Sequence, residues 1–189
     1  MHRQQLLQLL NEYTTEIQDE KEMFEQFQQF VQTQTDCFKR ELAIGHITAS
    51  VWIVNQTLDK TLLTHHVKIQ KWLQPGGHCD GDTDVVLSAL RELEEETGLR
   101  NIQLIEGVFD LDVHTIAAYK NESEHLHFDV RFLVIADEKE QILISDESND
   151  LRWFHLDEIP SANPSRSLQR MVEKTAFIRQ SRPVSFSVK

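Results

Sequence analysis

The chain has 189 residues, of which 40% are hydrophobic and 26% are charged. This composition is typical of a globular protein with one sizeable core. The formal net charge is −12, and the sequence contains no basic patch, so we expect the protein to repel a nucleic-acid polymer. No apolar run approaches the roughly 20 residues that cross a membrane, and the start of the chain lacks the apolar segment of a secretory signal. Two cysteines, Cys37 and Cys79, offer no disulfide framework, so we expect a cytoplasmic location without a membrane partner.

The first forty residues are expected to be helical, because apolar residues recur there at helical spacing. Asp19 followed by Glu22 resembles a capping box, which predicts that a second helix begins there. No glycine or proline precedes Gly45, so we assign residues 1–44 to an N-terminal helical extension packed on the same domain as residues 45–189. Two roles are open for this extension: it packs on a face of the sheet, which we expect, or it forms the contact of a homodimer. The apolar stripe of its first helix comprises Leu6, Leu7, Leu9, Leu10, Tyr13 and Ile17.

Beyond residue 45 the hydrophobic pattern changes to the shorter period of strands, interrupted by two helices. One helix is predicted from about Asp84 to Thr97. Another follows Asn163-Pro164, which is typical of an N-cap with proline at the first helical position, and runs to about Ser181. This order predicts an α/β (α+β) fold, in which a mixed β-sheet is sandwiched between helices. The predicted strands are His46–Asn55, Thr61–Gln70, Ile102–Val108, Phe109–Ile116, His125–Ala136 and the short segment Arg152–Phe154, which follows a loop at Ser145–Asp150.

The helix expected at residues 84–97 carries most of the chemistry. Glu92, Glu95 and Glu96 are spaced i, i+3 and i+4, so their carboxylates lie within an arc of roughly 100° on one helix face. Carboxylates this close repel one another. A hard divalent cation such as Mg²⁺ would remove the repulsion, because it takes oxygen ligands and bridges them to phosphates. The alternative is that the glutamates form a solvated helix face.

The stretch from Gly77 to Leu99 resembles the box of the Nudix hydrolase family, G-x5-E-x7-R-E-U-x-E-E-x-G-U, where U is aliphatic. The first glutamate of that pattern is Thr83 here. In the family this glutamate mostly supports the arginine, so the replacement concerns the anchoring of Arg91 more than the metal site. The positions in register are Gly77, Arg91, Glu92, Leu93, Glu95, Glu96, Gly98 and Leu99. Similarity to a bacterial Nudix subgroup without a settled substrate extends over about residues 45–160, through Gly45–Ser50, Trp72–His78, Phe109–His114 and His125–Asp129.

The resemblance implies a Nudix-type fold and a hydrolase that cleaves a phosphoanhydride bond in a nucleoside diphosphate linked to another moiety. Its partner is then a small phosphorylated, nucleotide-type substrate. The resemblance also implies a Mg²⁺ or Mn²⁺ ion, which four ligands would hold: the carboxylates of Glu92, Glu95 and Glu96 and the carbonyl of Gly76.

The catalytic residues implied by the resemblance are Arg91, Glu147 and Glu92. Arg91 would pair with a carboxylate of its own helix and hold that rotamer. The general base comes from a later loop in some Nudix enzymes and from the box helix in others. Glu147, six residues before Trp153, is our first candidate for the base, and Glu92 is its rival. The alternative for Glu147 is a surface loop acid.

Two later strands present a polar face. Alternation places Asp112 and His114 on one face of the first, and His127 and Asp129 on one face of the second. If the strands are neighbours, the four side chains converge, and we predict that they bind substrate beside the metal site. The alternative is a solvated sheet face, or histidines satisfied by neighbouring acids.

Two further functions stay open. One is a catalytically silent Nudix-fold module that binds a nucleotide metabolite, although the intact glutamates argue against it. The other is a hydrolase of a non-nucleotide diphosphate, although no lysine-rich segment suits a highly phosphorylated inositol. His78 and Cys79 lack a second pair at ligand spacing, so no zinc site is expected from them.

Overall fold

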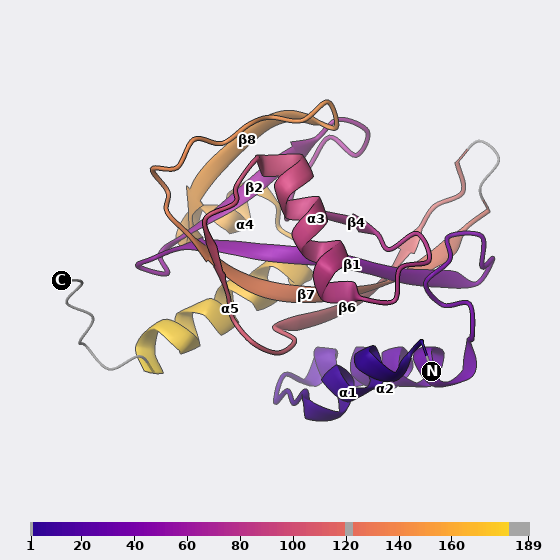
Figure 1. Cartoon of the computed structure of the whole chain (residues 1–189). Helices are drawn as coiled ribbons and strands as arrows, with labels where there is room; N and C mark the ends of the chain where they lie inside the picture. Colours follow the sequence, from indigo (N-terminus) through magenta and orange to yellow (C-terminus); the bar gives the residue numbers. More distant parts are fainter. Residues whose placement is uncertain (1, 120–122, 182–189) are drawn as a thin grey trace.

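The computed structural model describes residues 2–119 and 123–181, and Figure 1 shows how its elements are arranged. Within these residues, none of the helices combines the length and the apolar character that crossing a membrane requires. The helices are α1 (Gln4–Glu12), α2 (Gln18–Thr33), α3 (Val85–Thr97), α4 (Ile159–Ala162) and α5 (Arg166–Ser181), with a 3₁₀ turn at Leu156–Glu158. The strands are β1 (Gly45–Asn55), β2 (Lys60–His66), β3 (Trp72–Leu73), β4 (Gly76–His78), β5 (Ile102–Leu104), β6 (Asp110–Ile116), β7 (His125–Ala136) and β8 (Ser148–His155).

The described strands form one mixed sheet with β1 at its centre. β1 runs parallel to β7 along its whole length, from Gly45 opposite Leu126 to Asn55 opposite Ala136. On its other edge β1 pairs antiparallel with β4 and then with β2. β5 and β6 extend the sheet beyond β7, and β3 and β8 extend it beyond β2. The predicted mixed sheet is therefore confirmed.

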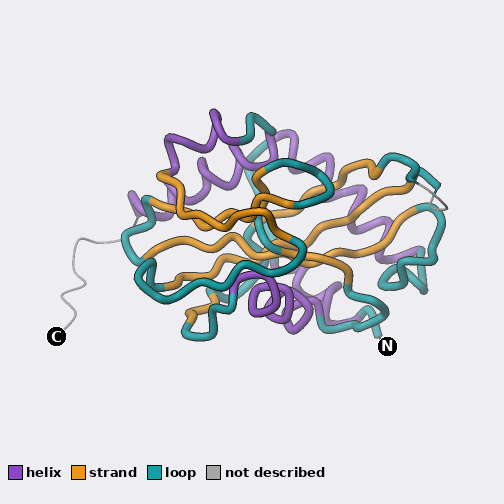
Figure 2. Tube along the Cα trace, turned by 90° about the horizontal axis from the view of Figure 1, so that it is seen from above, coloured by secondary structure: helices purple, strands orange, loops and turns teal. Residues whose placement is uncertain are grey.

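Helices cover both sides of this sheet, as the view from above in Figure 2 shows. α1, α2 and α3 form one buried cluster with alternate residues of β1 and β7, among them Ile47, Val51 and Phe128. α4 and α5 form a second cluster with residues that point the other way, among them Trp52 and Leu133. Successive strand side chains point to opposite faces, so β1 is buried on both sides. The prediction that helices sandwich the sheet is confirmed.

The N-terminal extension packs on this body through aromatic contacts. Phe30 stacks on Phe128 of β7 with ring centroids 3.8 Å apart, and Phe27 meets the same ring edge-on at 5.6 Å. Arg3 ties α1 to the end of α2 by donating to the carbonyl of Val31 at 2.7 Å. These contacts accord with packing on the sheet, while the division into residues 1–44 and 45–189 stays a prediction.

The capping box predicted at Asp19 is wrong. α2 begins one residue earlier, at Gln18, and Ile17 precedes it without a side-chain cap. The Asp19 carboxylate instead accepts hydrogen bonds from Arg166 at 3.0 Å and from Arg170 at 3.5 Å. The Asp19 side chain, which the local sequence assigns to the helix cap, therefore forms tertiary ion pairs with Arg166 and Arg170.

The start predicted for the last helix is also displaced. α5 begins at Arg166, two residues after Pro164. Asn163 ends α4, and its side-chain oxygen accepts from the backbone nitrogen of Ser165 at 3.0 Å. The Asn-Pro pair therefore forms the turn between two helices. The predicted end at Ser181 agrees with the structure.

Three predicted strand boundaries differ, two of them because turns intervene. β2 stops at His66, whose ring nitrogen accepts from the backbone nitrogen of Lys68 at 3.0 Å, and Gln70 has a φ of 54°. β5 stops at Leu104, before the turn at Gly107, where φ is 88°. β8 already begins at residue 148, so only the first half of the predicted loop at 145–150 is a loop.

Candidate active site

The box helix α3 has the limits that the sequence predicts. Asp84 caps its start by accepting from the backbone nitrogens of Val86 at 3.1 Å and Leu87 at 3.0 Å. Gly98 ends it in the left-handed conformation, with a φ of 72°. The helix buries Ala89 and, unusually for a charged residue, Glu96, which is only 7% exposed.

Burial and mutual repulsion strain the carboxylates of α3. Burial and the negative charges of Glu92, Glu147 and Glu95 together raise the pKa of Glu96 to about 7, against one stabilising bond. That bond comes from the backbone nitrogen of Gly76, which donates to the Glu96 carboxylate at 2.7 Å. Burial also raises the pKa of Glu92, and Glu95 adds to the shift. The three glutamates therefore share one electrostatic site at the turn before β4.

Arg91 holds Glu92 in place. Its guanidinium donates to the Glu92 carboxylate at 3.0 Å and to the carbonyl of His78 at 2.8 Å. The pairing expected from the sequence is thus present, and it does not depend on a carboxylate at position 83. The Glu92 carboxylate also lies against Gly77, where a Cβ atom would come within 2.7 Å of it.

Glu147 reaches the same site from the loop before β8. It is exposed, and its carbonyl accepts from the backbone nitrogen of Val67 at 2.9 Å. Its charge acts on both Glu96 and Glu92, so the fold brings it beside the α3 carboxylates across fifty residues of sequence. Its role as base and the metal-ligand roles of the glutamates stay predictions.

The donor set fits a hard divalent cation. Mg²⁺ and Mn²⁺ take oxygen ligands, and this site offers carboxylates whose charged forms repel one another and which Arg91 and the Gly76 nitrogen compensate only in part. A cation here would reduce the mutual repulsion of four carboxylates, those of Glu92, Glu95, Glu96 and Glu147. Among the described residues, a different group already has its possible ligand atoms within 4.8 Å of one another. That group consists of three histidines and does not include the glutamates of α3.

The polar strand face forms as predicted. β6 and β7 are antiparallel neighbours, with Asp112 opposite Asp129 and His114 opposite His127. Asp112 pairs with the ring of His114 at 3.0 Å and with Arg131 at 3.2 Å. Burial alone would raise the pKa of Asp112, but the charges of Arg131 and the bond from His114 hold it well below its usual range. Asp112 is therefore ionised, in an ion network that includes Arg131 and Arg170.

Asp129 connects this face to the turn that binds Glu96. Its carboxylate accepts from Thr48 at 3.0 Å, from Ser50 at 2.8 Å and, more weakly, from Gln74 at 3.4 Å. Ser50 lies opposite Gly76 in the β1–β4 ladder. The polar face thus begins beside the carboxylate site, although the substrate-binding role of its residues stays a prediction.

Sequence reasoning missed a buried ion network behind this face. Asp110 is fully buried and accepts from Arg170 at 2.8 Å, from Lys174 at 2.8 Å and from Arg131 at 3.1 Å. Burial would raise the pKa of Asp110, but these cations hold it below its ordinary value. Glu20 of α2, also fully buried, bonds to Lys174. The alternation that singles out Asp112 includes Asp110 as well, but two of its three cations, Arg170 and Lys174, come from α5, and local sequence does not predict where α5 packs.

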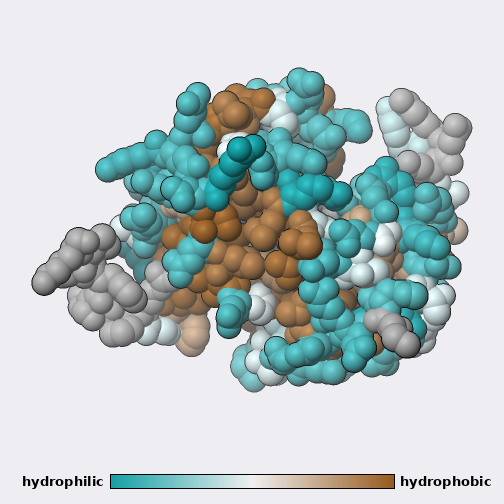
Figure 3. Space-filling view, viewed as in Figure 1, coloured by the Kyte–Doolittle hydropathy of each residue, from teal (hydrophilic) through white to brown (hydrophobic). Residues whose placement is uncertain are grey.

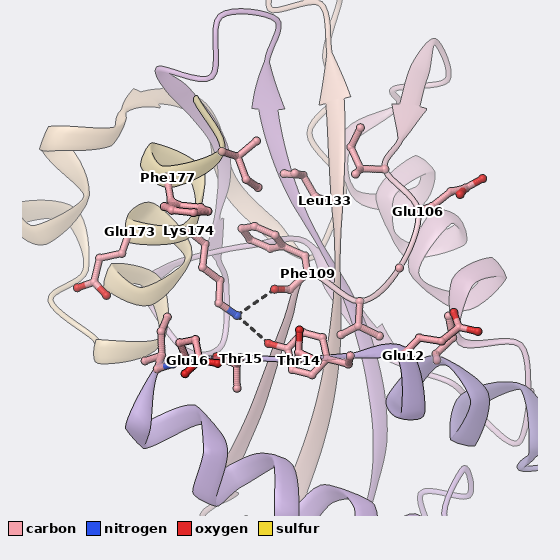
Figure 4. A pocket seen from close by; sticks show the side chains of 17 residues that line it. Glu12, Thr14, Thr15, Glu16, Glu106, Phe109, Leu133, Glu173, Lys174 and Phe177 are labelled. Atoms are coloured by element: carbon pink, nitrogen blue, oxygen red, sulfur yellow. Dashed lines mark hydrogen bonds between the residues drawn. The ribbon is translucent and has the colours of Figure 1, made fainter. Parts of the chain in front are cut away.

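A cavity of about 730 Å³ lies between the N-terminal extension, the β5–β6 segment and α5 (Figure 4). Lys174 reaches into it and donates to the Phe109 carbonyl at 2.9 Å and to the Tyr13 hydroxyl at 2.8 Å. Apolar side chains gather in the middle of the molecular face in Figure 3, and Phe177, which lines the cavity, is 70% exposed. Its acidic lining residues, Glu12, Glu16, Glu106 and Glu173, would repel phosphates, so the α3 site remains the candidate for catalysis.

Comparison with known proteins identifies the family. The chain is 34% identical over 107 residues to the asymmetrical bis(5'-nucleosyl)-tetraphosphatase of Rattus norvegicus, which covers 55% of this chain and 69% of that protein. Its fold is similar to a Caenorhabditis elegans Ap4A hydrolase in a binary complex, with 18% identity, a TM-score of 0.59, and coverage of 71% of this chain and 98% of that one. A Nudix-family hydrolase from Clostridium perfringens has 25% identity and a TM-score of 0.51, covering 70% and 97%.

These similarities define the fold as that of the Nudix class. The NUDIX domain model matches residues 45–173, and the chain belongs to the Nudix family. It is accordingly a Nudix pyrophosphohydrolase, as the sequence predicts.

Proposed function

We propose that this enzyme uses a divalent metal ion, Mg²⁺ or Mn²⁺, to hydrolyse the phosphoanhydride chain of a nucleotide derivative. The observation that carries the proposal is the set of coupled, partly buried carboxylates where α3 meets the turn at Gly76. Buried charges of one sign destabilise a protein unless they are compensated. A cation that also binds phosphates would compensate these carboxylates and link them to the substrate.

Dinucleoside tetraphosphates are the first substrates to test. The rodent relatives are named as asymmetrical bis(5'-nucleosyl)-tetraphosphatases, at 34% and 33% identity. Such a substrate is a nucleotide whose phosphate chain is linked to a second moiety, which is the substrate class that the sequence predicts.

The residues have separate tasks in this proposal. Glu92, Glu95, Glu96 and the Gly76 carbonyl hold the metal ion. When bound, the ion neutralises charge on the phosphates. Arg91 fixes the Glu92 rotamer through its 3.0 Å contact. Glu147 accepts the proton of the attacking water, since it is exposed and lies beside the carboxylates, whereas Glu92 is occupied by Arg91.

We also propose that the polar strand face orients the substrate. His114 and His127 stand at its outer end, and Asp112 and Asp129 hold the face together through ion pairs and hydrogen bonds. Gln74 links Asp129 to the turn before β4.

The remaining parts of the proposal concern the setting. Both cysteines are buried free thiols, which supports a reducing cytoplasm. The contacts of Phe27 and Phe30 with Phe128 favour packing of the extension within one chain over a homodimer contact.

The first experiment measures nucleotide or phosphate release from a substrate panel. The panel holds dinucleoside polyphosphates, nucleoside triphosphates, ADP-ribose, nucleotide sugars, NADH and coenzyme A, each with Mg²⁺, with Mn²⁺ and with EDTA. We expect release with metal and none with EDTA. The variant Glu95→Gln/Glu96→Gln should lose about 10²–10⁴-fold in turnover, because several kcal/mol of transition-state stabilisation go with the metal.

Glu94→Gln is the matched control, because Glu94 lies on the same helix but pairs with Arg100 at 2.7 Å. It should keep wild-type turnover. Equal activity of the double variant and the wild type would overturn the metal site. If the whole panel is silent while one nucleotide still raises the melting temperature, the protein is a binding module. Release only from isoprenoid or inositol diphosphates would instead define a non-nucleotide hydrolase.

The base is tested by Glu147→Gln against Asp146→Asn, its neighbour in the same exposed loop. We expect Glu147→Gln to lower kcat by about 10²–10⁴-fold with Mn²⁺ binding retained, and Asp146→Asn to leave kcat unchanged. Near-normal turnover of Glu147→Gln would transfer the role to Glu92.

A further inference from the structure

Three histidines converge where β1 and β7 begin. His46 lies opposite His127 in the parallel ladder, and His125 precedes His127 by two residues on the same face. One ligand nitrogen from each ring lies within 4.8 Å of the other two. The ring centroids are 4.7 Å apart for His46 and His127, and 5.0 Å apart for His46 and His125.

Two of these rings carry buried nitrogen atoms without hydrogen-bond partners among the described residues. His46 is only 2% exposed, and neither of its ring nitrogens has a partner. The Nε2 atom of His127 is buried and unpartnered as well. Buried polar atoms in this state are costly, and each such group in a folded protein calls for an explanation.

The third ring has one nitrogen engaged in a hydrogen bond and a second that a metal ion could use. Nδ1 of His125 lies 2.8 Å from the carbonyl of Ser123 and donates to it. This bond fixes the tautomer and leaves the Nε2 lone pair free to bind a metal. Metal-binding histidines typically use their second nitrogen in this way.

The surroundings also keep the rings neutral. Burial, together with His78 and His125, lowers the pKa of His46 to about 4. Burial lowers the pKa of His127 to about 2, with contributions from His46, His78 and His114. Neutral imidazole is the form that coordinates metals.

We propose that His46, His125 and His127 form a binding site for a borderline transition-metal ion, with zinc as the reference ion. Zinc–nitrogen bonds of about 2.0–2.1 Å place tetrahedral ligand atoms about 3.4 Å apart. The rings therefore need to draw together by no more than about 1.4 Å, a small rotation of side chains. A fourth position stays open for water or an added ligand. The proposal does not rest on the hydrolase function.

This site differs from the carboxylate site in place and in chemistry, although His127 also belongs to the polar strand face that we propose orients the substrate. His46 lies four residues along β1 from Ser50, the partner of Gly76, which is about 13 Å of strand. Imidazole nitrogens favour zinc, copper and nickel, whereas carboxylates favour magnesium and manganese. One chain would thus bind two kinds of cation at two different sites. Zinc would link the first residues of β1 to the first residues of β7.

The test is zinc retention by the full chain after EDTA treatment, dialysis and zinc addition in excess Mg²⁺. We expect one zinc ion per chain by elemental analysis, a tetrahedral cobalt absorption spectrum after substitution with Co²⁺, and a higher melting temperature with zinc. His125→Gln is the first variant, because this ring is only partly buried and the fold should tolerate the change.

Zinc affinity of His125→Gln and of His127→Gln should fall by at least about 10–100-fold, the loss that even outer-shell changes cause. Glu92→Gln/Glu96→Gln should retain the zinc, and so should the exposed control His155→Gln. Absence of zinc and of the cobalt spectrum in the wild type would overturn the site. Retention that survives both histidine variants, or that disappears in the glutamate variant, would overturn it too.

Discussion

Gly77 leaves room for the Glu92 carboxylate by having no side chain. A Cβ atom there would lie 2.7 Å from the Glu92 carboxylate, so Gly77→Ala forces that group to shift. We expect kcat on the best substrate to fall by about 10²-fold, since misplacement by an ångström has this cost. Circular dichroism should show an unchanged fold.

Gly81→Ala is the opposite case in the same turn region. Nothing lies within 4 Å of its added Cβ, but its φ of 87° disfavours a side chain. This variant should lose about 1–3 kcal/mol of stability and keep its kcat. If both alanine variants have the same kcat, the close contact between position 77 and Glu92 does not affect catalysis, and the prediction is wrong.

Residues of the site differ in how far the sequence alone could predict them. Glu92, Glu95 and Glu96 lie on one helix, so their spacing decides their common face. Glu147 comes from a distant loop, and the sequence indicated it only through its distance of six residues from Trp153. His46 was not predicted to lie among the histidines, because its partner is 81 residues away in a parallel ladder. Local periodicity contains no information about that pairing.

At the level of elements, Arg170 fastens α5 to β6. It is 1% exposed and bonds to Asp110, to Asp112 at 3.1 Å and to the carbonyl of Leu111 at 2.8 Å. Arg170→Leu leaves two buried carboxylates without this partner, so we expect a loss of about 3–5 kcal/mol in the free energy of unfolding. Urea denaturation measures it.

Arg166→Leu is the matched control on the same helix. Arg166 is 46% exposed and pairs with Asp19 and Glu173 at the surface. Its removal should cost at most about 1 kcal/mol. Similar losses for the two arginine variants would mean that burial does not distinguish them.

The elements themselves were largely predictable, and their ends were not. The limits of α3 follow from Asp84 and Gly98, which act within the helix. The start of α2 was mispredicted because Asp19 bonds to Arg166, which lies 147 residues later. Local signals therefore predict an element well until a tertiary partner competes for the same side chain.

Over the whole molecule, the buried ion network makes stability depend on acid. The cations of Arg131, Arg170 and Lys174 hold the pKa of Asp110 below its ordinary value of about 3.9, and Arg131 and His114 do the same for Asp112. The unfolded chain then binds more protons as pH falls, so stability is complete above about pH 5 and declines below about pH 4.

Urea unfolding between about pH 7 and pH 3 tests this dependence. Asp112→Asn should be less stable at neutral pH and should show a shallower decline. Asp36→Asn is the control, since the pair of Asp36 with Lys39 is exposed, and its decline should match the wild type. A constant free energy of unfolding down to about pH 3 would contradict the prediction.

The parallel pairing of β1 with β7 also has a consequence for how the chain folds. All of β1 is buried, yet its longest partner begins some eighty residues later, as Thr48 and Asp129 illustrate with a separation of 81. Contacts of this span require closure of a long loop before they stabilise anything, and they slow folding. During synthesis β1 therefore leaves the ribosome as an apolar strand with an unpaired edge, and it depends on chaperones or on delayed collapse until β7 has been made.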